Sequence, residues 1–465
     1  MNDDAQRVKK LLAELAAQRK SIQDLYSSVE DVESTVQRSI LVTQQASAAA
    51  LDDELQRAAD LVDAAITIDD EQEAVDIPTL PTVPAPPSIP PPKKSLEPSS
   101  EAARVAIGML IRDPPLNSLH TFIRYHLALG FDHIYLYFDD ISNENNDVAA
   151  MDIGKSYGDR VSVFHCTRVW FQQTQQLGSK CWYKYGHFVE TDLIARQVLA
   201  IEQALRQCSR DNMDWLLHID IDELLHCQHT ISFHDFSVGM YFAHLPIHVD
   251  TVRFLNMEAA PESMELQMCH QNDYFQDVTL FKSNPLTVDG TTLRAHWPKG
   301  RNIFNAYQNG KSAVRINADV LPFGSHKFRS DDRILLSIVA KGIQVLHYPN
   351  ASFELWWRKY KLLGKFPDHW CGTEKIPLDS FHMQSRNVVC CGGDRGDGDE
   401  DEEKGDTQLR SNVDKDHACE LYAAHVVFNN DEQNNVLLSA GLLVRYTKLA
   451  EEIGQLWTEH EQNKN

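Results

Sequence analysis

The sequence lacks any long hydrophobic run. Its 465 residues contain no stretch of eighteen apolar residues, whereas a helix needs about 20 of them to cross a bilayer. Residues 1–20 are charged and polar, without the apolar core of a secretory signal peptide. We therefore expect a soluble, cytoplasmic protein with no transmembrane segment. A Golgi or ER lumenal location, or membrane association, would require that the native N-terminus is missing.

Positive charge and paired cysteines are also scarce. The formal net charge is −23, which argues against a protein that binds a nucleic-acid backbone. The nine cysteines lie between Cys166 and Cys419 without zinc-finger CxxC pairs, and their odd number argues against a fully paired disulfide framework. If this acidic chain binds a phosphate ester, a metal ion must offset the repulsion between the two.

Two common catalytic motifs are absent as well. The segment GKS at Gly310 has no upstream glycine at the spacing of a phosphate-binding P-loop. No GxSxG nucleophile elbow occurs either. These absences exclude a P-loop nucleotide hydrolase and a serine hydrolase of the α/β type.

Residues 1–75 are predicted to form a helical coiled coil that allows self-association. The first seventy residues contain neither glycine nor proline, and apolar residues recur in steps of three and four. A lone amphipathic helix that packs on the main domain is the alternative. Residues 76–100 are rich in proline and predict an extended linker, with docking of an SH3-type domain as the alternative.

Residues 101–386 are predicted to form an α/β domain with a mostly parallel sheet and helices on both faces. VAIGMLIRD and FDHIYLYFDD indicate buried strands, separated by a helix from Pro114 to Gly130. A second helix, from about Gly186 to Arg210, leads into the strand WLLHID. This strand–helix–strand order predicts a sheet that binds ligands at the carboxyl ends of its strands.

The C-terminal part of the chain has a different composition. Residues 387–415 include the glycine- and acid-rich run CCGGDRGDGDEDEEKGD and predict a disordered loop. Residues 416–465 predict C-terminal helices, over about 416–428 and 432–461.

The segment WLLHIDIDELL places three carboxylates at the end of a buried strand. Asp220 and Asp222 share one side of the strand if its geometry persists, and Glu223 follows directly. Two carboxylates in this arrangement suit one hard divalent cation, Mg²⁺ or Mn²⁺, with open positions for phosphate oxygens. A helix start capped by Asp220 or Asp222 is the alternative.

Four segments in this order resemble GT-A glycosyltransferases of the family 2-like and family 92-like group. They are LNSLHTFIRYHLALGFDHIYLYFDDIS, the DXD segment WLLHIDIDELL, GKSAVR with GSHKF, and VLHYPNASFELWWRKYKLLGKF. The resemblance covers roughly residues 103 to 370. It implies a GT-A fold, which is a Rossmann-like sheet with helices on both faces.

The resemblance also assigns roles to residues. It implies that Asp220 and Asp222 hold the metal, with His347 as a third ligand and His326 as the competing candidate. Asp139 and Asp140 match the acids that contact the base or ribose of the donor. The remaining candidates are basic residues that stabilise the leaving diphosphate, and carboxylates that act in catalysis. The basic candidates are Lys311, Arg315 and Lys359; the catalytic candidates are Asp222 and Glu354, with Asp273, Asp277 and Glu258 as further choices for the base.

Together these features predict a metal-dependent glycosyltransferase. We expect it to move a sugar from a nucleotide-diphosphate donor, a UDP-sugar, to a hydroxyl of a glycan, protein or small molecule, with inversion at the anomeric carbon. Mn²⁺ or Mg²⁺ would bind the diphosphate. A metal-dependent phosphohydrolase or nucleotidyltransferase and a non-catalytic coiled-coil scaffold are the alternatives.

Overall fold

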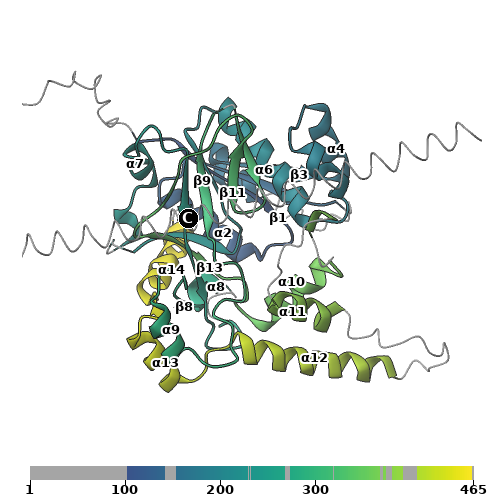
Figure 1. Ribbon diagram of the computed structural model, residues 1–465, viewed down its shortest axis with the longest axis vertical. Coiled ribbons are helices and arrows are strands. Elements are labelled where there is room, and N and C mark those ends of the chain that lie inside the picture. Colours follow the sequence, from purple (N-terminus) through teal and green to yellow (C-terminus); the bar gives the residue numbers. More distant parts are fainter. Residues whose placement is uncertain are drawn as a thin grey trace, which may run out of the picture. The chain divides into compact units, whose positions relative to one another are not determined.

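The computed structural model of the protein describes nine segments of the chain (Figure 1). They are residues 102–141, 153–228, 230, 232–267, 273–317, 319–366, 370–372, 380–390 and 406–462. The predicted coiled coil of residues 1–75 and the linker of residues 76–100 lie outside these segments.

The larger sheet has seven strands in the order β12-β6-β9-β4-β1-β2-β3. These are β1 (Val105–Ile111), β2 (His133–Asp139), β3 (Val161–Cys166), β4 (Trp215–His218), β6 (Thr251–Phe254), β9 (Lys311–Arg315) and β12 (Ser337–Val339). Only β9 runs antiparallel to its neighbours, and the other four strand pairs are parallel. The mostly parallel sheet predicted from the sequence is therefore present.

Helices cover both faces of this sheet, which is why β1 and β2 are apolar along their length. They include α2 (Leu116–Ala128), α4 (Arg168–Gln176), α5 (Trp182–Tyr185), α6 (Leu193–Arg210) and α7 (Val238–Ala243), with 3₁₀ turns at Ile153–Arg160, Gly186–Phe188 and Phe233–Asp235. Ile107 of β1 belongs to the core cluster that contains Phe122 of α2, whereas Ala106 belongs to the cluster of α6. At Gly108 an added Cβ would lie 2.9 Å from Ala204 Cβ, so glycine allows α6 to pack closely.

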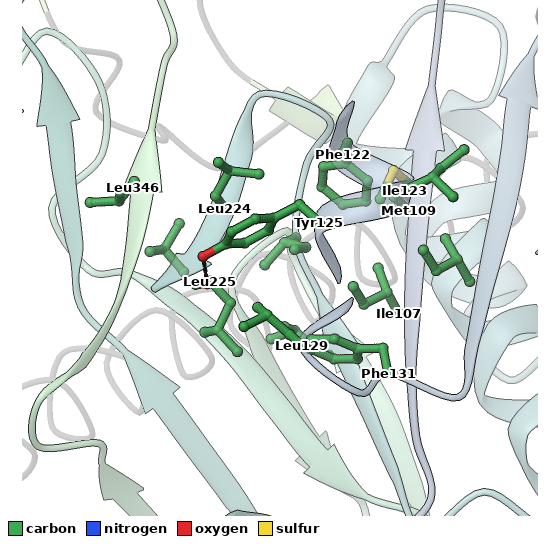
Figure 2. Packing of buried hydrophobic residues seen from close by; sticks show 14 of the residues in the cluster. Ile107, Met109, Phe122, Ile123, Tyr125, Leu129, Phe131, Leu224, Leu225 and Leu346 are labelled. Carbon is green, nitrogen blue, oxygen red and sulfur yellow. Dashed lines mark hydrogen bonds between the residues drawn. The ribbon is translucent and has the colours of Figure 1, made fainter. Parts of the chain in front are cut away.

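A second, mostly antiparallel sheet has five strands in the order β14-β8-β7-β13-β5. Its strands are β5 (Glu223–Cys227), β7 (Asn256–Ala259), β8 (Leu280–Lys282), β13 (Ile343–His347) and β14 (Leu443–Arg445). Figure 2 shows apolar residues of β1, α2, β5 and β13 in one cluster, with Tyr125 Oη donating a hydrogen bond to Leu225 O (2.9 Å). The two sheets thus share a core.

The remaining elements are a two-stranded hairpin and the helices of the second half of the chain. The hairpin is β10 (Val320–Phe323) with β11 (Lys327–Ser330), and the helices are α8 (Tyr274–Asp277), α9 (Gly290–His296), α10 (Phe353–Leu363), α11 (Ser380–Cys390), α12 (Asp406–His425), α13 (Asp431–Ser439), α14 (Thr447–Gln462) and the 3₁₀ turn Trp370–Gly372. Trp356, Phe381 and Tyr422 join α10, α11 and α12 in one apolar cluster, and Figure 1 shows these three helices next to one another. Within the described segments, every helix is too short or too polar to cross a membrane.

The C-terminal part differs most from the expectation. The predicted loop of residues 387–415 is helical at both ends, since α11 continues to Cys390 and α12 starts at Asp406; residues 391–405 lie outside the described segments. The helix expected over 432–461 is interrupted after Ser439, and β14 joins the second sheet before α14 begins. Gly441, with φ +68°, lies in the turn between α13 and β14.

The backbone just before β9 predicts a large effect of one glycine substitution. Gly310 has φ +72°, and a Cβ there would stand far inside van der Waals distance of Phe254 O. We expect Gly310→Ala to lower the free energy of unfolding by at least about 3 kcal/mol, because strain and overlap with backbone add together. Urea unfolding measures the change.

Gly300→Ala is the matched control. Gly300 has φ +79° but nothing within 4 Å of an added Cβ, so only the backbone cost of about 1–2 kcal/mol applies. Equal losses in the two variants would contradict the close approach at Gly310.

Candidate active site

The three carboxylates lie in a tight connection between the two sheets, which we call the acidic turn (residues 219–223). β4 ends at His218, where its pairing with β1 ends, and β5 begins at Glu223 and pairs with β13. The strand geometry does not persist through Asp220 and Asp222, so the expectation that both lie on one strand face is wrong. A strand follows instead of a helix, and the helix-cap alternative is also wrong.

Asp220 is bound by two side chains of the surrounding elements. Lys311 Nζ, at the start of β9, lies 2.5 Å from Asp220 Oδ2, and Gln197 Nε2 of α6 donates to Oδ1 (2.7 Å). Burial opposes the charge of Asp220, but the Lys311 ammonium outweighs it and lowers the pKa of this carboxyl. Lys311 and Gln197 thus fix both oxygens of Asp220.

Lys311 is a fully buried cation. Its Nζ also lies 3.7 Å from Glu223 Oε2 and donates to Ser325 O (3.4 Å). Burial favours the neutral amine, but Asp220 and Glu223 overcome this effect and raise the pKa of Lys311. The charge of the acidic turn is therefore compensated in part by the protein itself.

Glu223 is the most buried of the three acids. Its Oε2 accepts a hydrogen bond from Asp220 N (2.7 Å), and its Oε1 accepts none from the described residues. Burial, together with the charges of Asp220 and Asp222, raises the pKa of Glu223 well above its usual range. The carboxyl of Glu223 thus stabilises the turn through its contact with Asp220 N.

Asp222 is the acid of the turn that faces two basic side chains beyond hydrogen-bond distance. Its Oδ2 lies 3.7 Å from His347 Nε2 and 3.7 Å from Lys359 Nζ. Its backbone oxygen accepts a hydrogen bond from Tyr348 N (2.8 Å), which fixes the turn against the end of β13. Burial opposes the charge, but His347 and Lys359 lower the pKa of Asp222.

The gap between Asp222 and His347 fits a divalent cation. Two bonds of about 2.1 Å from a small metal ion span up to about 4.2 Å, which exceeds the 3.7 Å between Asp222 Oδ2 and His347 Nε2. Among the described residues, no group of three or more His, Cys, Asp and Glu side chains is arranged to hold a metal ion. Of the three predicted ligands, Asp222 and His347 face each other, and Asp220 contacts Lys311 and Gln197; the three-ligand set stays a prediction.

His326 does not take the place of His347. Its Nδ1 contacts Gly310 O (3.0 Å), and its ring packs against Tyr307 (4.3 Å between centroids). Of the two candidate histidines, His347 is the one whose Nε2 faces Asp222.

Asp139 and Asp140 lie at the carboxyl end of β2, on the same edge as the acidic turn because β1, β2 and β4 are parallel. Arg196 of α6 donates from Nε to Asp139 Oδ2 (3.0 Å), and His165 Nε2 contacts Asp140 Oδ2 (2.6 Å). Burial raises the pKa of Asp139, an effect that Arg196 opposes.

Arg196 and Gln197 are site residues that the sequence analysis missed. They are adjacent on α6 and tie Asp139 and Asp220 to the same helix. The available signal was two long polar side chains within the buried part of an amphipathic helix.

Arg315 is not part of this site. It pairs in register with Trp215, at the opposite end of β4 from His218, and its guanidinium lies 4.5 Å above the Trp215 ring. Since β9 is antiparallel to β4, its first residue, Lys311, lies at the edge where β4 ends, and its last residue, Arg315, lies at the opposite edge. The assignment of Arg315 to the donor is therefore corrected.

The carboxylates considered as the catalytic base are mostly occupied. Asp273 is buried as the N-cap of α8 and accepts hydrogen bonds from Ser118 and Thr121. Glu258 is buried against Lys282, and Asp277 Oδ2 accepts from Gln267 N (2.7 Å). Glu354 is exposed in the first turn of α10, the helix that carries Lys359.

Comparisons with known proteins point to one class of enzyme. The chain is 27% identical over 244 residues to Glycosyltransferase-like At2g41451 of Arabidopsis thaliana, covering 50% of this chain and 50% of that protein. It is 22% identical over 340 residues to Glycosyltransferase-like At3g57200 of the same plant, covering 70% of this chain and 58% of that protein. The chain thus spans little more than half the length of these relatives. No protein-family model matches it.

The buried position of Lys311 predicts a large effect on stability. We expect Lys311→Met to lower the free energy of unfolding by about 3–5 kcal/mol, because Asp220 and Glu223 would remain buried without their cation. The double variant Lys311→Met/Asp220→Asn should recover part of this loss. Urea unfolding of the four proteins of the cycle measures both effects.

Lys359→Met is the matched control. The Lys359 side chain is 39% exposed and lies beyond hydrogen-bond distance of Asp222, so we expect a change within about 1 kcal/mol. If Lys359→Met lowered the free energy of unfolding as much as Lys311→Met does, this would contradict the conclusion that the buried cation contributes more than the exposed one.

Proposed function

We propose that this protein is a metal-dependent glycosyltransferase of the GT-A type, from the family 2-like and family 92-like group. It would transfer a sugar from a nucleotide-diphosphate donor, a UDP-sugar, to a hydroxyl acceptor with inversion. The observation that carries the proposal is Asp222 at the carboxyl edge of the sheet, 3.7 Å from both His347 Nε2 and Lys359 Nζ. The similarity to glycosyltransferase-like proteins supports the same reaction class.

The topology supports a nucleotide site at this edge. β2 and β3 lie on one side of β1 and β4 lies on the other, so the strand order reverses between β1 and β4. Ligands of open α/β sheets bind beyond the carboxyl ends of the strands at such a reversal. Asp139 and Asp140, after β2, and the acidic turn, after β4, flank this point, which suits contacts to the nucleoside and to the diphosphate respectively.

Asp222 and His347 are the proposed ligands of Mn²⁺ or Mg²⁺. When bound, such an ion would neutralise the diphosphate and stabilise the charge that develops as it leaves. Lys359 is half-exposed beside Asp222 and is placed to add a second positive charge to the leaving group. Lys311 is already engaged with Asp220, so we assign it the role of holding the acidic turn.

Glu354 is the proposed catalytic base. Asp273 and Glu258 are buried and engaged by neighbouring side chains, whereas Glu354 is exposed to solvent. A base must reach the acceptor hydroxyl to remove its proton during direct displacement.

Self-association through residues 1–75 and a cytoplasmic location stay predictions from the sequence.

The proposal predicts metal-dependent release of UDP. With a panel of UDP-sugars and a hydroxyl acceptor, we expect glycosyl transfer with Mn²⁺ and none after chelation. Asp222→Asn should reduce transfer about 100-fold or more, because one metal ligand loses its charge. UDP release and glycosylated product are measured together.

Asp289→Asn is the matched control for charge, since Asp289 is the exposed N-cap of α9. It should transfer sugar as the wild type does. Release of inorganic phosphate without a glycosylated product would instead favour the phosphohydrolase alternative.

Glu354→Gln tests the assignment of the base. We expect kcat to fall about 100-fold or more, because the amide cannot accept the proton, while Mn²⁺ affinity stays unchanged. Glu432→Gln, an exposed glutamate in the first turn of α13, is the control. Full activity of Glu354→Gln would assign the base to another carboxylate.

A further inference from the structure

One aromatic ring, that of Tyr307, contacts three basic side chains near the acidic turn. The ring of Tyr307 stacks on that of His347, with centroids 4.8 Å apart and an interplanar angle of 29°. It also contacts the ring of His326 (4.3 Å), and Lys311 Nζ lies 5.2 Å from its centroid. Stacked rings and a cation near an aromatic face are both attractive arrangements.

The His347 imidazole packs against this ring in the protein interior. His347 is 4% exposed, and its Nδ1 is buried without a hydrogen-bond partner among the described residues. Metal-binding histidines are usually oriented by a hydrogen bond at the second ring nitrogen. These residues supply no such bond, and the Tyr307 ring stacks on the imidazole at an interplanar angle of 29°.

The segment that carries Tyr307 is neither helix nor strand, yet a buried ion pair holds it. Glu258 Oε2 accepts hydrogen bonds from Asn305 N (3.0 Å) and Ala306 N (2.8 Å). Lys282 pairs with the same carboxylate, and both side chains are 1% exposed. Loss of a contact to this buried carboxylate would strongly destabilise the protein. The backbone before Tyr307 is therefore fixed.

Two buried asparagines hold the backbone on the other side. Asn256 Nδ2 donates to Tyr307 O (2.9 Å), and Asn256 Oδ1 accepts from Gly310 N (3.2 Å). Asn284 Nδ2 donates to Gln308 O (2.9 Å). Asn256 is the first residue of β7, and Asn284 follows the end of β8 by two residues. The second sheet therefore positions the backbone that carries Tyr307.

We propose that Tyr307 is a positioning residue: its ring holds the His347 imidazole toward Asp222 and so sets the affinity of this pair for a divalent cation. This inference rests on the proposed function, because it assigns the cation to Asp222 and His347. It adds a residue that touches neither the metal nor the acidic carboxylates.

The test measures binding of Mn²⁺ in the presence of UDP, by the electron paramagnetic resonance signal of free Mn²⁺. We expect Tyr307→Ala and Tyr307→Leu to bind Mn²⁺ about tenfold more weakly than the wild type, as for other residues that orient a metal ligand. Tyr307→Phe keeps the ring and should stay within about threefold of the wild type. Thermal unfolding of each variant shows that it is folded.

Tyr241→Ala is the matched control, because Tyr241 is a half-buried tyrosine that packs on Phe242 and Phe254, outside the acidic turn. It should bind Mn²⁺ as the wild type does. If Tyr307→Ala does not fold, Tyr307→Leu, which keeps most of the buried volume, gives the result.

The outcomes separate this inference from the proposed function. A wild-type protein that binds no Mn²⁺ with UDP overturns both. If the wild type binds Mn²⁺ and Tyr307→Leu binds it equally well, only the role of Tyr307 is overturned. Equal weakening in Tyr307→Phe and Tyr307→Ala would assign the effect to the hydroxyl and also contradict positioning by the ring.

Discussion

The buried ammonium of Lys311 is the contact on which the site depends. Three carboxylates within four residues repel one another and lose hydration as the turn is buried. Lys311 offsets this by pairing with Asp220 at 2.5 Å and lying 3.7 Å from Glu223. Lys311 is the first residue of β9, the strand that runs antiparallel to β4. Because β9 is reversed, its first residue lies at the edge where the parallel strands end.

This compensation divides the acids into two kinds. Asp220 and Glu223 are consumed in internal contacts that hold the turn, whereas Asp222 faces His347 and Lys359 across gaps too long for hydrogen bonds. A site built in this way leaves one carboxylate able to act on a ligand. Glu223 is the first residue of β5 and pairs in register with His347 of β13. This pairing places the histidine opposite the acidic turn.

The second sheet acts as the support for the ligand side of the turn. It carries His347 at the end of β13, the Glu258–Lys282 ion pair between β7 and β8, and Asn256 at the start of β7. These polar groups are buried where apolar packing would ordinarily be expected, and Glu258 and Asn256 fix the backbone close to Tyr307 and Lys311. Precision at the edge of the large sheet thus comes from groups outside it.

The sequence by itself determined the mostly parallel sheet, its covering helices and the edge where the acids collect, because buried strands and amphipathic helices follow from local apolar periodicity. It also singled out Asp222, His347 and Lys359, which the structure brings together. Only the tertiary structure decided that Asp220 is engaged by Lys311 and Gln197, that Arg315 lies at the other edge, and that β14 interrupts the C-terminal helices. Those outcomes depend on strand direction and on contacts between residues at least 23 positions apart in the chain, and the identity and spacing of neighbouring residues carry no information about either.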